Sequence, residues 1–172
     1  MLGVGLLILR VVVGLTLAAH GAQKLFGWFG GPGLKGFAGM LEQLNLRPAL
    51  AWAVVAGLAE FLGGLALALG LLTPLAAYAI AGSMLVAIFT VHLARGFWNH
   101  QGGLEFPLTI LASVVAVALA GPGAYSLDRG LGIALPEPLT LIVGAVVLVA
   151  GVLAAMAGRL SARVVSARAQ TT

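Results

Sequence analysis

Residues 49–93 read ALAWAVVAGLAEFLGGLALALGLLTPLAAYAIAGSMLVAIFTVHL, and Glu60 is the only formally charged residue among them. A helix needs about 20 mostly apolar residues to cross the hydrocarbon core of a bilayer, so this stretch is long enough to cross twice. Thr73-Pro74 divides the stretch, and a proline begins a helix more readily than it continues one. The sequence therefore predicts two antiparallel transmembrane helices, at about 49–72 and 75–93.

The rest of the chain has the same apolar character. Of its 172 residues, 61% are hydrophobic and 8% are charged, whereas a soluble domain carries about 25% charged residues. Further apolar runs lie at about 2–25, 104–120 and 139–157, the second of them short. Hydrocarbon offers no partners to backbone groups, so these runs are expected to be helices, and the alternating pattern of barrel strands is absent. The predicted fold class is all-α, a polytopic membrane helix bundle with a four-helix core and a fifth, C-terminal transmembrane helix.

The predicted organisation has three parts, a four-helix membrane core at 1–130, an additional transmembrane helix at 131–158 and a basic C-terminal tail at 159–172. Within the core, a glycine-rich loop precedes a short segment near 34–46. The apolar residues of that segment recur at helical spacing: Leu34, Phe37, Leu41 and Leu44. This pattern predicts a short helix lying in the membrane interface.

Lysine and arginine predict the orientation of the bundle, because they are enriched on the cytoplasmic side of a membrane. With five spans, one side of the membrane collects seven of these residues: Lys24, Lys35, Arg47, Arg95, Arg159, Arg163 and Arg168. The other side collects only Arg129. We therefore expect the N-terminus to face outward and the C-terminus to be cytoplasmic.

Composition also excludes several kinds of chemistry. The chain has no cysteine, which rules out disulfides, thiolate nucleophiles and cysteine-ligated clusters. No aromatic residues are interleaved with a basic patch, so nucleic acid is not an expected partner, and membrane lipid is. No metal site is predicted, because no third residue at ligand spacing accompanies His20 and His92; ligation of a metal or haem by these two histidines is the alternative.

Ionisable side chains at bilayer depth are costly and indicate function by default. Consecutive spans alternate in direction, so the end of the first, the start of the second, the end of the third and the start of the fourth share one side. His20, Gln23, Lys24, His92 and Glu105 should therefore gather there. We interpret these five residues as candidates for binding a ligand or relaying protons, and Lys24 and Glu105 as an ion pair at the rim.

Two further candidates are expected deeper in the membrane. Glu60 lies near the middle of the second span, and Arg10 lies about 5 Å from the middle of the first at 1.5 Å per residue. They are predicted to form an ion pair with each other. Several structural roles are the alternatives: the pair fixes helix register, the histidines only pack, Lys24 snorkels to the headgroups, and Glu105 is a carboxylate at a helix start that the helix dipole favours.

Aromatic residues are expected on the same side as this polar group: Phe26, Trp28, Phe29, Phe97 and Trp98. An aromatic belt at the membrane interface is the simplest interpretation of their position. The functional alternative is that Phe26, Trp28, Phe97 and Trp98 line the mouth of a pocket for a lipid-soluble ring.

At these residues the sequence resembles the DoxX family, over about residues 4–130. The resemblance rests on five runs: AAHGAQKLFGWFGGPGLKG at 18–36, GLAEFLGGLALALGLLTPLAA at 57–77, VAIFTVHLARGFW at 86–98, GGLEFPLTILA at 102–112 and GPGAYSLD at 121–128. Its motif positions are His20, Gln23, Lys24, Glu60, His92, Glu105 and Asp128. The resemblance implies a four-helix protein of the bacterial inner membrane.

The family is named after a subunit of a thiosulfate:quinone oxidoreductase, and other members are described as membrane anchors in redox or oxidative-stress complexes. Related families use a cysteine pair, which this chain lacks, so dithiol chemistry is not carried over. The leading hypothesis is a redox-associated subunit with an intramembrane polar pocket that binds a quinone, with no covalently bound cofactor and with electrons from a partner or a bound substrate. The alternatives are a non-catalytic scaffold for soluble oxidoreductase or oxidative-stress enzymes, and a small-solute transporter acting as a homo-oligomer.

Overall fold

The computed structural model describes residues 1–169, with side chains described as far as Ser161. Residues 170–172 lie outside this description, as do the side chains of Arg163 and Arg168, so their expected place in a basic tail is a prediction. The described part of the chain is helical and contains no strand, which confirms the all-α fold class.

Five long helices build the molecule: α1 (Leu2–Phe26), α3 (Ala49–Leu69), α4 (Thr73–Ala87), α5 (Glu105–Ala120) and α7 (Leu139–Ala169). Four described helical stretches are long and apolar enough to cross a membrane: Leu2–Phe26, Ala49–Leu69, Thr73–Arg95 and Leu139–Ser161. The expected fourth span, α5, has 16 residues. At 1.5 Å per residue it measures about 24 Å, shorter than a hydrocarbon core of about 30 Å.

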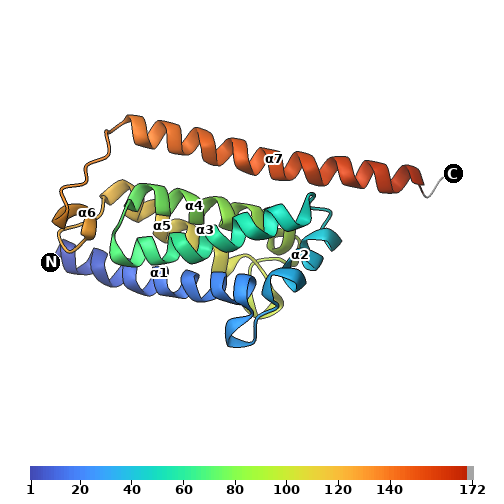
Figure 1. Cartoon of the computed structure of the whole chain (residues 1–172), viewed down its shortest axis with the longest axis horizontal. Helices are drawn as coiled ribbons and strands as arrows, with labels where there is room; N and C mark the ends of the chain where they lie inside the picture. The colour runs from blue at the N-terminus through green and yellow to red at the C-terminus, as the bar shows by residue number, and fades with distance from the viewer. Residues whose placement is uncertain (170–172) are drawn as a thin grey trace.

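Four of these helices form a bundle, and α7 lies along its outside (Figure 1). Helix α3 packs against both α1 and α4, α4 packs against α5, and α7 packs on α4. The N-terminus and the end of α7 lie at opposite ends of the bundle in Figure 1, as an odd number of crossings requires. The expected antiparallel pairing of the helices on either side of Thr73-Pro74 is confirmed by α3 and α4.

Glycines, which have no side chain, let the backbones of α1 and α3 approach closely. A Cβ on Gly21 would lie 2.3 Å from the backbone nitrogen of Phe61, and one on Gly14 would lie 2.5 Å from the carbonyl oxygen of Gly64. Both distances are too short for any larger residue. This contact fixes the register of the two antiparallel helices, so that Glu60 lies level with Gly21–Lys24 rather than with Arg10.

A buried carboxylate holds the turn between α3 and α4. Asp128, at the start of the short helix α6 (Leu127–Gly130), accepts hydrogen bonds from the backbone nitrogens of Leu72 and Thr73, at 2.7 and 2.9 Å, and from the Thr73 hydroxyl at 2.7 Å. These donors belong to the first turn of α4, where unpaired N–H groups favour a negative charge. Asp128 is 3% exposed, so the carboxylate stabilises the turn from inside the protein.

The segment expected as an interfacial helix near 34–46 forms α2 (Gly33–Gln43), which packs on α1 and α3. Its apolar face is buried at Phe37 and Leu41. The basic segment expected as a separate tail from residue 159 onward is continuous with α7 as far as Ala169. Arg159 attaches α7 to the bundle, because its guanidinium donates to the carbonyl oxygens of Leu44, Phe89 and Thr90.

Candidate functional site

A cavity of about 950 Å³ lies between α3, α4 and α7, and residues of α1, α2 and α5 complete its walls. Small-molecule sites have volumes of about 300–1,000 Å³ and are mostly apolar with a few polar groups. Most of the lining side chains here are apolar. The polar and ionisable ones are His20, Lys24, Trp52, Glu60, Tyr78, Ser83, Thr90, His92 and Thr140.

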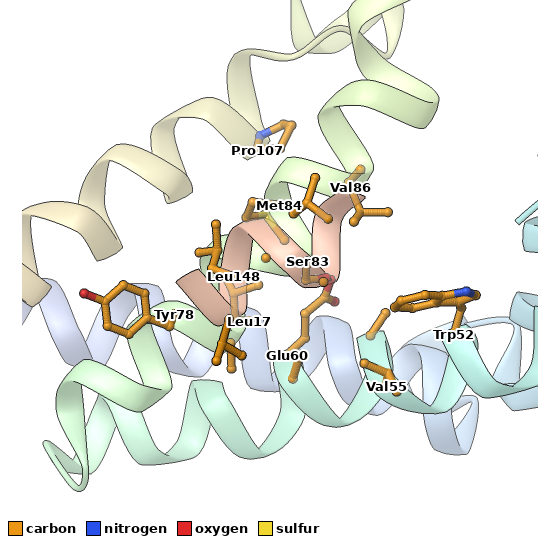
Figure 2. A pocket seen from close by; sticks show the side chains of 18 of the residues that line it. Leu17, Trp52, Val55, Glu60, Tyr78, Ser83, Met84, Val86, Pro107 and Leu148 are labelled. Atoms are coloured by element: carbon orange, nitrogen blue, oxygen red, sulfur yellow. The ribbon is translucent and has the colours of Figure 1, made fainter. Parts of the chain in front are cut away.

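Lys24, Glu60 and Ser83 form a polar cluster in the wall of this cavity. The Lys24 ammonium lies 2.5 Å from both carboxylate oxygens of Glu60, and the Ser83 hydroxyl donates to Glu60 Oε1 at 2.6 Å. Figure 2 shows Glu60 and Ser83 between Tyr78 at one end of the view and Trp52 at the other. Glu60 is 1% exposed and Lys24 is 24% exposed, so the charge pair is largely withdrawn from solvent.

The two histidines of the spans line the same cavity. The His20 ring lies 5.4 Å from the ring of Phe106, on α5. His92 Nδ1 lies 2.7 Å from the carbonyl oxygen of Gly102. With Nδ1 bound in this way, the Nδ1–H tautomer leaves the other ring nitrogen as an acceptor. His92 ends a π-helical turn, η2 (Ile88–His92), a distortion found frequently at functional sites.

The predicted ion pair between Arg10 and Glu60 is wrong. Arg10 lies in the N-terminal half of α1, away from Lys24, where its Nη2 donates to the carbonyl oxygen of Tyr125 at 2.5 Å and its Nε to that of Leu6 at 3.4 Å. The close α1–α3 contact sets this outcome, because it places Lys24 rather than Arg10 level with Glu60. Arg10 is fully buried and lies outside the cavity lining.

The predicted pair between Lys24 and Glu105 is also wrong. Glu105 accepts a hydrogen bond from the backbone nitrogen of Asn99 at 2.9 Å, so it fastens the loop before α5. Gln23 Nε2 donates to the carbonyl oxygen of Phe29 at 3.4 Å and fastens the loop after α1. Neither side chain lines the cavity, so of the five residues expected at this end, His20, Lys24 and His92 share it.

The aromatic residues proposed for a pocket mouth lie elsewhere. Phe26, Trp28, Phe97 and Trp98 are about half exposed and are outside the cavity lining. They form two pairs, Phe26 with Trp28 and Phe97 with Trp98, each with ring centroids 5.1 Å apart. Exposed aromatic pairs next to the ends of spanning helices are typical of an interfacial belt, which was the simplest interpretation of the sequence.

Three residues of this region were not singled out from the sequence. Ser83 is a small hydroxyl residue in the apolar interior of α4, and a polar group at that depth was a usable signal. Trp52 was not distinguished from the apolar residues around it. Arg159 was assigned to the tail because nothing in its local sequence indicates that it reaches back to α2 and η2.

The arrangement suits a flat, mainly apolar molecule with one or two polar atoms. The Lys24 ammonium and the His20 imidazole can donate a hydrogen bond into the cavity, and the second ring nitrogen of His92 can accept one. The buried carboxylate of Glu60 keeps Lys24 and Ser83 oriented. Lining residues such as Leu75 and Val143 are exposed on helices long enough to span a membrane, so such a molecule would reach the cavity from the bilayer.

The fold and this intramembrane site define a polytopic, α-helical membrane protein. The chain belongs to the DoxX family, whose model matches residues 5–93. That match covers α1 from residue 5 onward and the whole of α3 and α4, and with them the polar cluster and both histidines of the cavity.

Of three similar proteins, two carry names that place them in a membrane. The chain is 33% identical over 128 residues to the inner membrane protein YqjF of Escherichia coli, covering 73% of this chain and 91% of that protein. It is 31% identical over 133 residues to an uncharacterized membrane protein of Mycobacterium tuberculosis, covering 72% and 78%. It is 29% identical over 125 residues to a Bacillus subtilis protein named "Putative oxidoreductase CatD", covering 73% and 85%. No solved structure matches the chain.

Proposed function

We propose that this DoxX protein is a redox-associated subunit of the bacterial inner membrane that binds a quinone in its intramembrane cavity. The observation that carries the proposal is the polar cluster of Lys24, Glu60 and Ser83 in the wall of a mostly apolar cavity. A quinone needs an apolar slot for its ring and hydrogen-bond donors for its carbonyl oxygens. The name of the Bacillus subtilis relative supports a redox setting.

Each polar residue has a role in this proposal. Lys24 donates its remaining N–H to one quinone carbonyl oxygen, and His20 donates to the other carbonyl oxygen from the α1 side. Glu60 holds Lys24 in place, with Ser83 donating to the same carboxylate, and it accepts or returns a proton when the quinone changes its redox state. Electrons come from a partner oxidoreductase, so the chain's own part is to bind the ring and to supply protons.

The proposal is tested by quinone binding to the full chain in lipid nanodiscs. Titration with a decyl-tailed benzoquinone is followed by the quenching of tryptophan fluorescence, for which Trp52 stands in the cavity wall. We expect Glu60→Gln and His20→Ala each to weaken binding by about tenfold or more, the equivalent of one lost hydrogen bond to a charged or polar group.

Two exposed residues of the same types provide matched controls. Glu42 carries a 63% exposed carboxylate, and His100 lies in an exposed loop; both are outside the cavity lining. Glu42→Gln and His100→Ala should bind the quinone like the unchanged protein. Equal affinity in the unchanged protein, Glu60→Gln and His20→Ala would exclude this cavity as the quinone site.

A further inference from the structure

The cavity is much longer than the ring that its polar cluster could hold. On α7, its lining runs from Leu139 to Val152, and on α4 and the following turn from Leu75 to His92. At 1.5 Å per helical residue, the α7 wall alone extends about 20 Å. The polar cluster occupies only the middle of this length, between Tyr78 and Trp52 (Figure 2). The ends of the cavity therefore have mostly apolar walls, and the hydroxyls of Tyr78, Thr90 and Thr140 there already donate to backbone carbonyl oxygens.

The two ends of the cavity differ in how they are closed. Beyond Trp52, the cavity is closed by three buried side chains, Phe37, Leu41 and Leu46, which are 5%, 7% and 1% exposed. Beyond Tyr78, it is an apolar groove between α4 and α7, whose exposed lining residues are 47–58% accessible: Leu75, Val143 and Leu139. Because both helices span the membrane, an exposed apolar groove between them faces hydrocarbon.

Helix α7 is fastened at both ends of the cavity. Near its start, the Tyr78 hydroxyl donates to the carbonyl oxygen of Leu141 at 3.1 Å, and a Cβ on Gly144 would overlap the Tyr78 ring. Near its end, Arg159 donates to the carbonyl oxygens of Leu44 and Phe89, each at 3.1 Å. Between these two attachments, a Cβ on Gly151 would meet nothing within 4 Å. Helix α7 is therefore held in place as one wall of the cavity, and the space between α7 and the bundle stays open.

We infer that the ligand of this site carries a long hydrocarbon tail, and that the tail lies in the groove between α4 and α7. This groove is called the tail arm, and it is lined by Leu75, Ala79, Leu139 and Val143. The inference rests on the proposed quinone site and adds the class of quinone, one with an isoprenoid or alkyl tail. The ring lies at the polar cluster, and the tail leaves it past Tyr78 toward the bilayer.

The tail arm selects its occupant by shape. Lipid solvates a hydrocarbon tail about as well as a protein groove does, so the arm gains little from hydrophobic transfer alone. A side chain that fills the arm should therefore act by steric exclusion of the tail. It should leave the binding of a tail-less ring unchanged, because the polar cluster stays intact.

The experiment uses the same substitution at two positions of α7. Val143 lines the tail arm, whereas Val146, 62% exposed and close to the same depth, is outside the cavity lining. Val143→Trp and Val146→Trp are compared for nanodisc binding of a decyl-tailed benzoquinone and of the same ring without a tail. Ala79→Phe, on the α4 wall of the arm, repeats the test in case Val143→Trp does not fold.

We expect Val143→Trp and Ala79→Phe to weaken binding of the tailed quinone by about tenfold or more, and to leave binding of the tail-less ring within about twofold. Val146→Trp should change neither. Unchanged binding of the tailed quinone in Val143→Trp and Ala79→Phe would overturn the tail arm and leave the ring site standing. A phospholipid retained in place of quinone in native mass spectrometry would also overturn it. Failure of both quinones to bind the unchanged protein would overturn the proposed function itself.

Discussion

Lys24 on α1 and Glu60 on α3 form an ion pair at one level of the bundle, with the Lys24 ammonium 2.5 Å from both carboxylate oxygens. The same ammonium lies 5.0 Å from the centre of the Phe37 ring on α2. Residues of three helices, α1, α2 and α3, are therefore in contact at the Lys24 ammonium. Ser83 brings in α4 as a fourth, through its hydrogen bond to Glu60. The pair is thus both a structural joint and the polar part of the cavity wall.

Removal of Lys24 alone should destabilise the protein strongly. Lys24→Met leaves the carboxylate of Glu60 buried without its cation, which typically costs about 3–5 kcal/mol. Lys24→Met combined with Glu60→Gln should recover most of that loss, because no unpaired charge is left. Reversible unfolding in mixed detergent micelles measures both values as a double-mutant cycle. Arg47→Met is the control, since it breaks an exposed pair with Glu42 and should cost less than about 1 kcal/mol. Additive losses in the cycle would contradict the pairing.

Addition of a single methyl group at the α1–α3 contact should separate the helices. Gly21→Ala places a Cβ 2.3 Å from the backbone nitrogen of Phe61, and overpacking of this kind costs about 1–3 kcal/mol. Gly5→Ala, on the same helix with nothing within 4 Å of its Cβ, should be neutral or slightly stabilising because alanine is the better helix former. The readout is the midpoint of thermal unfolding in detergent. A midpoint for Gly21→Ala at or above that of Gly5→Ala would refute the close contact.

Asp128 should matter for stability through the start of α4. Asp128→Ala leaves the backbone nitrogens of Leu72 and Thr73 without an acceptor, and loss of such a cap costs about 1–2 kcal/mol. The substitution also removes the negative charge of Asp128, which lies near the buried Arg10 guanidinium. Glu137→Ala, an exposed carboxylate in the same connection to α7, is the matched control and should have no effect. Hydrogen exchange of the first turn of α4 separates the two: it should speed up in Asp128→Ala and stay slow in Glu137→Ala.

The orientation expected from lysine and arginine can be measured by labelling single introduced cysteines, because the chain contains no cysteine of its own. Single cysteines at Gln101 and at Leu131 lie in exposed connections at opposite ends of the bundle. In intact cells, a membrane-impermeant maleimide should label Leu131→Cys and not Gln101→Cys. After cell lysis it should label both. The reverse pattern in intact cells would place the C-terminus outside and overturn the predicted orientation.

Arg159 should hold the end of α7 against the bundle. Arg159→Gln removes a charged group that donates to the carbonyl oxygens of Leu44, Phe89 and Thr90. Those acceptors are then left to lipid or water, and we expect faster hydrogen exchange in α7 and in η2, with α1 and α3 unchanged. Arg159→Lys should recover part of the protection, because a lysine can reach one carbonyl oxygen at a time. Equal exchange in Arg159→Gln and the unchanged protein would show that α7 is held by its apolar contacts alone.

The number and order of the long helices could be predicted from the sequence, because each span must satisfy its own backbone hydrogen bonds in hydrocarbon. That requirement is local, so an apolar run of sufficient length is enough to identify a helix, as at 49–93. The expectation that His20, Lys24 and His92 lie toward one end followed from alternating helix direction. All three line the same cavity.

The pairing of the charges was decided only by the tertiary structure. Glu60 binds Lys24, rather than Arg10, because contact between backbones at Gly14 and Gly21 shifts the register of α1 against α3. Ion pairing depends on distances of a few ångströms between separate helices. The order of residues along one helix does not determine those distances. The cavity under α7 has the same origin, since it arises where Tyr78 and Arg159 hold that helix and the residues between them leave space.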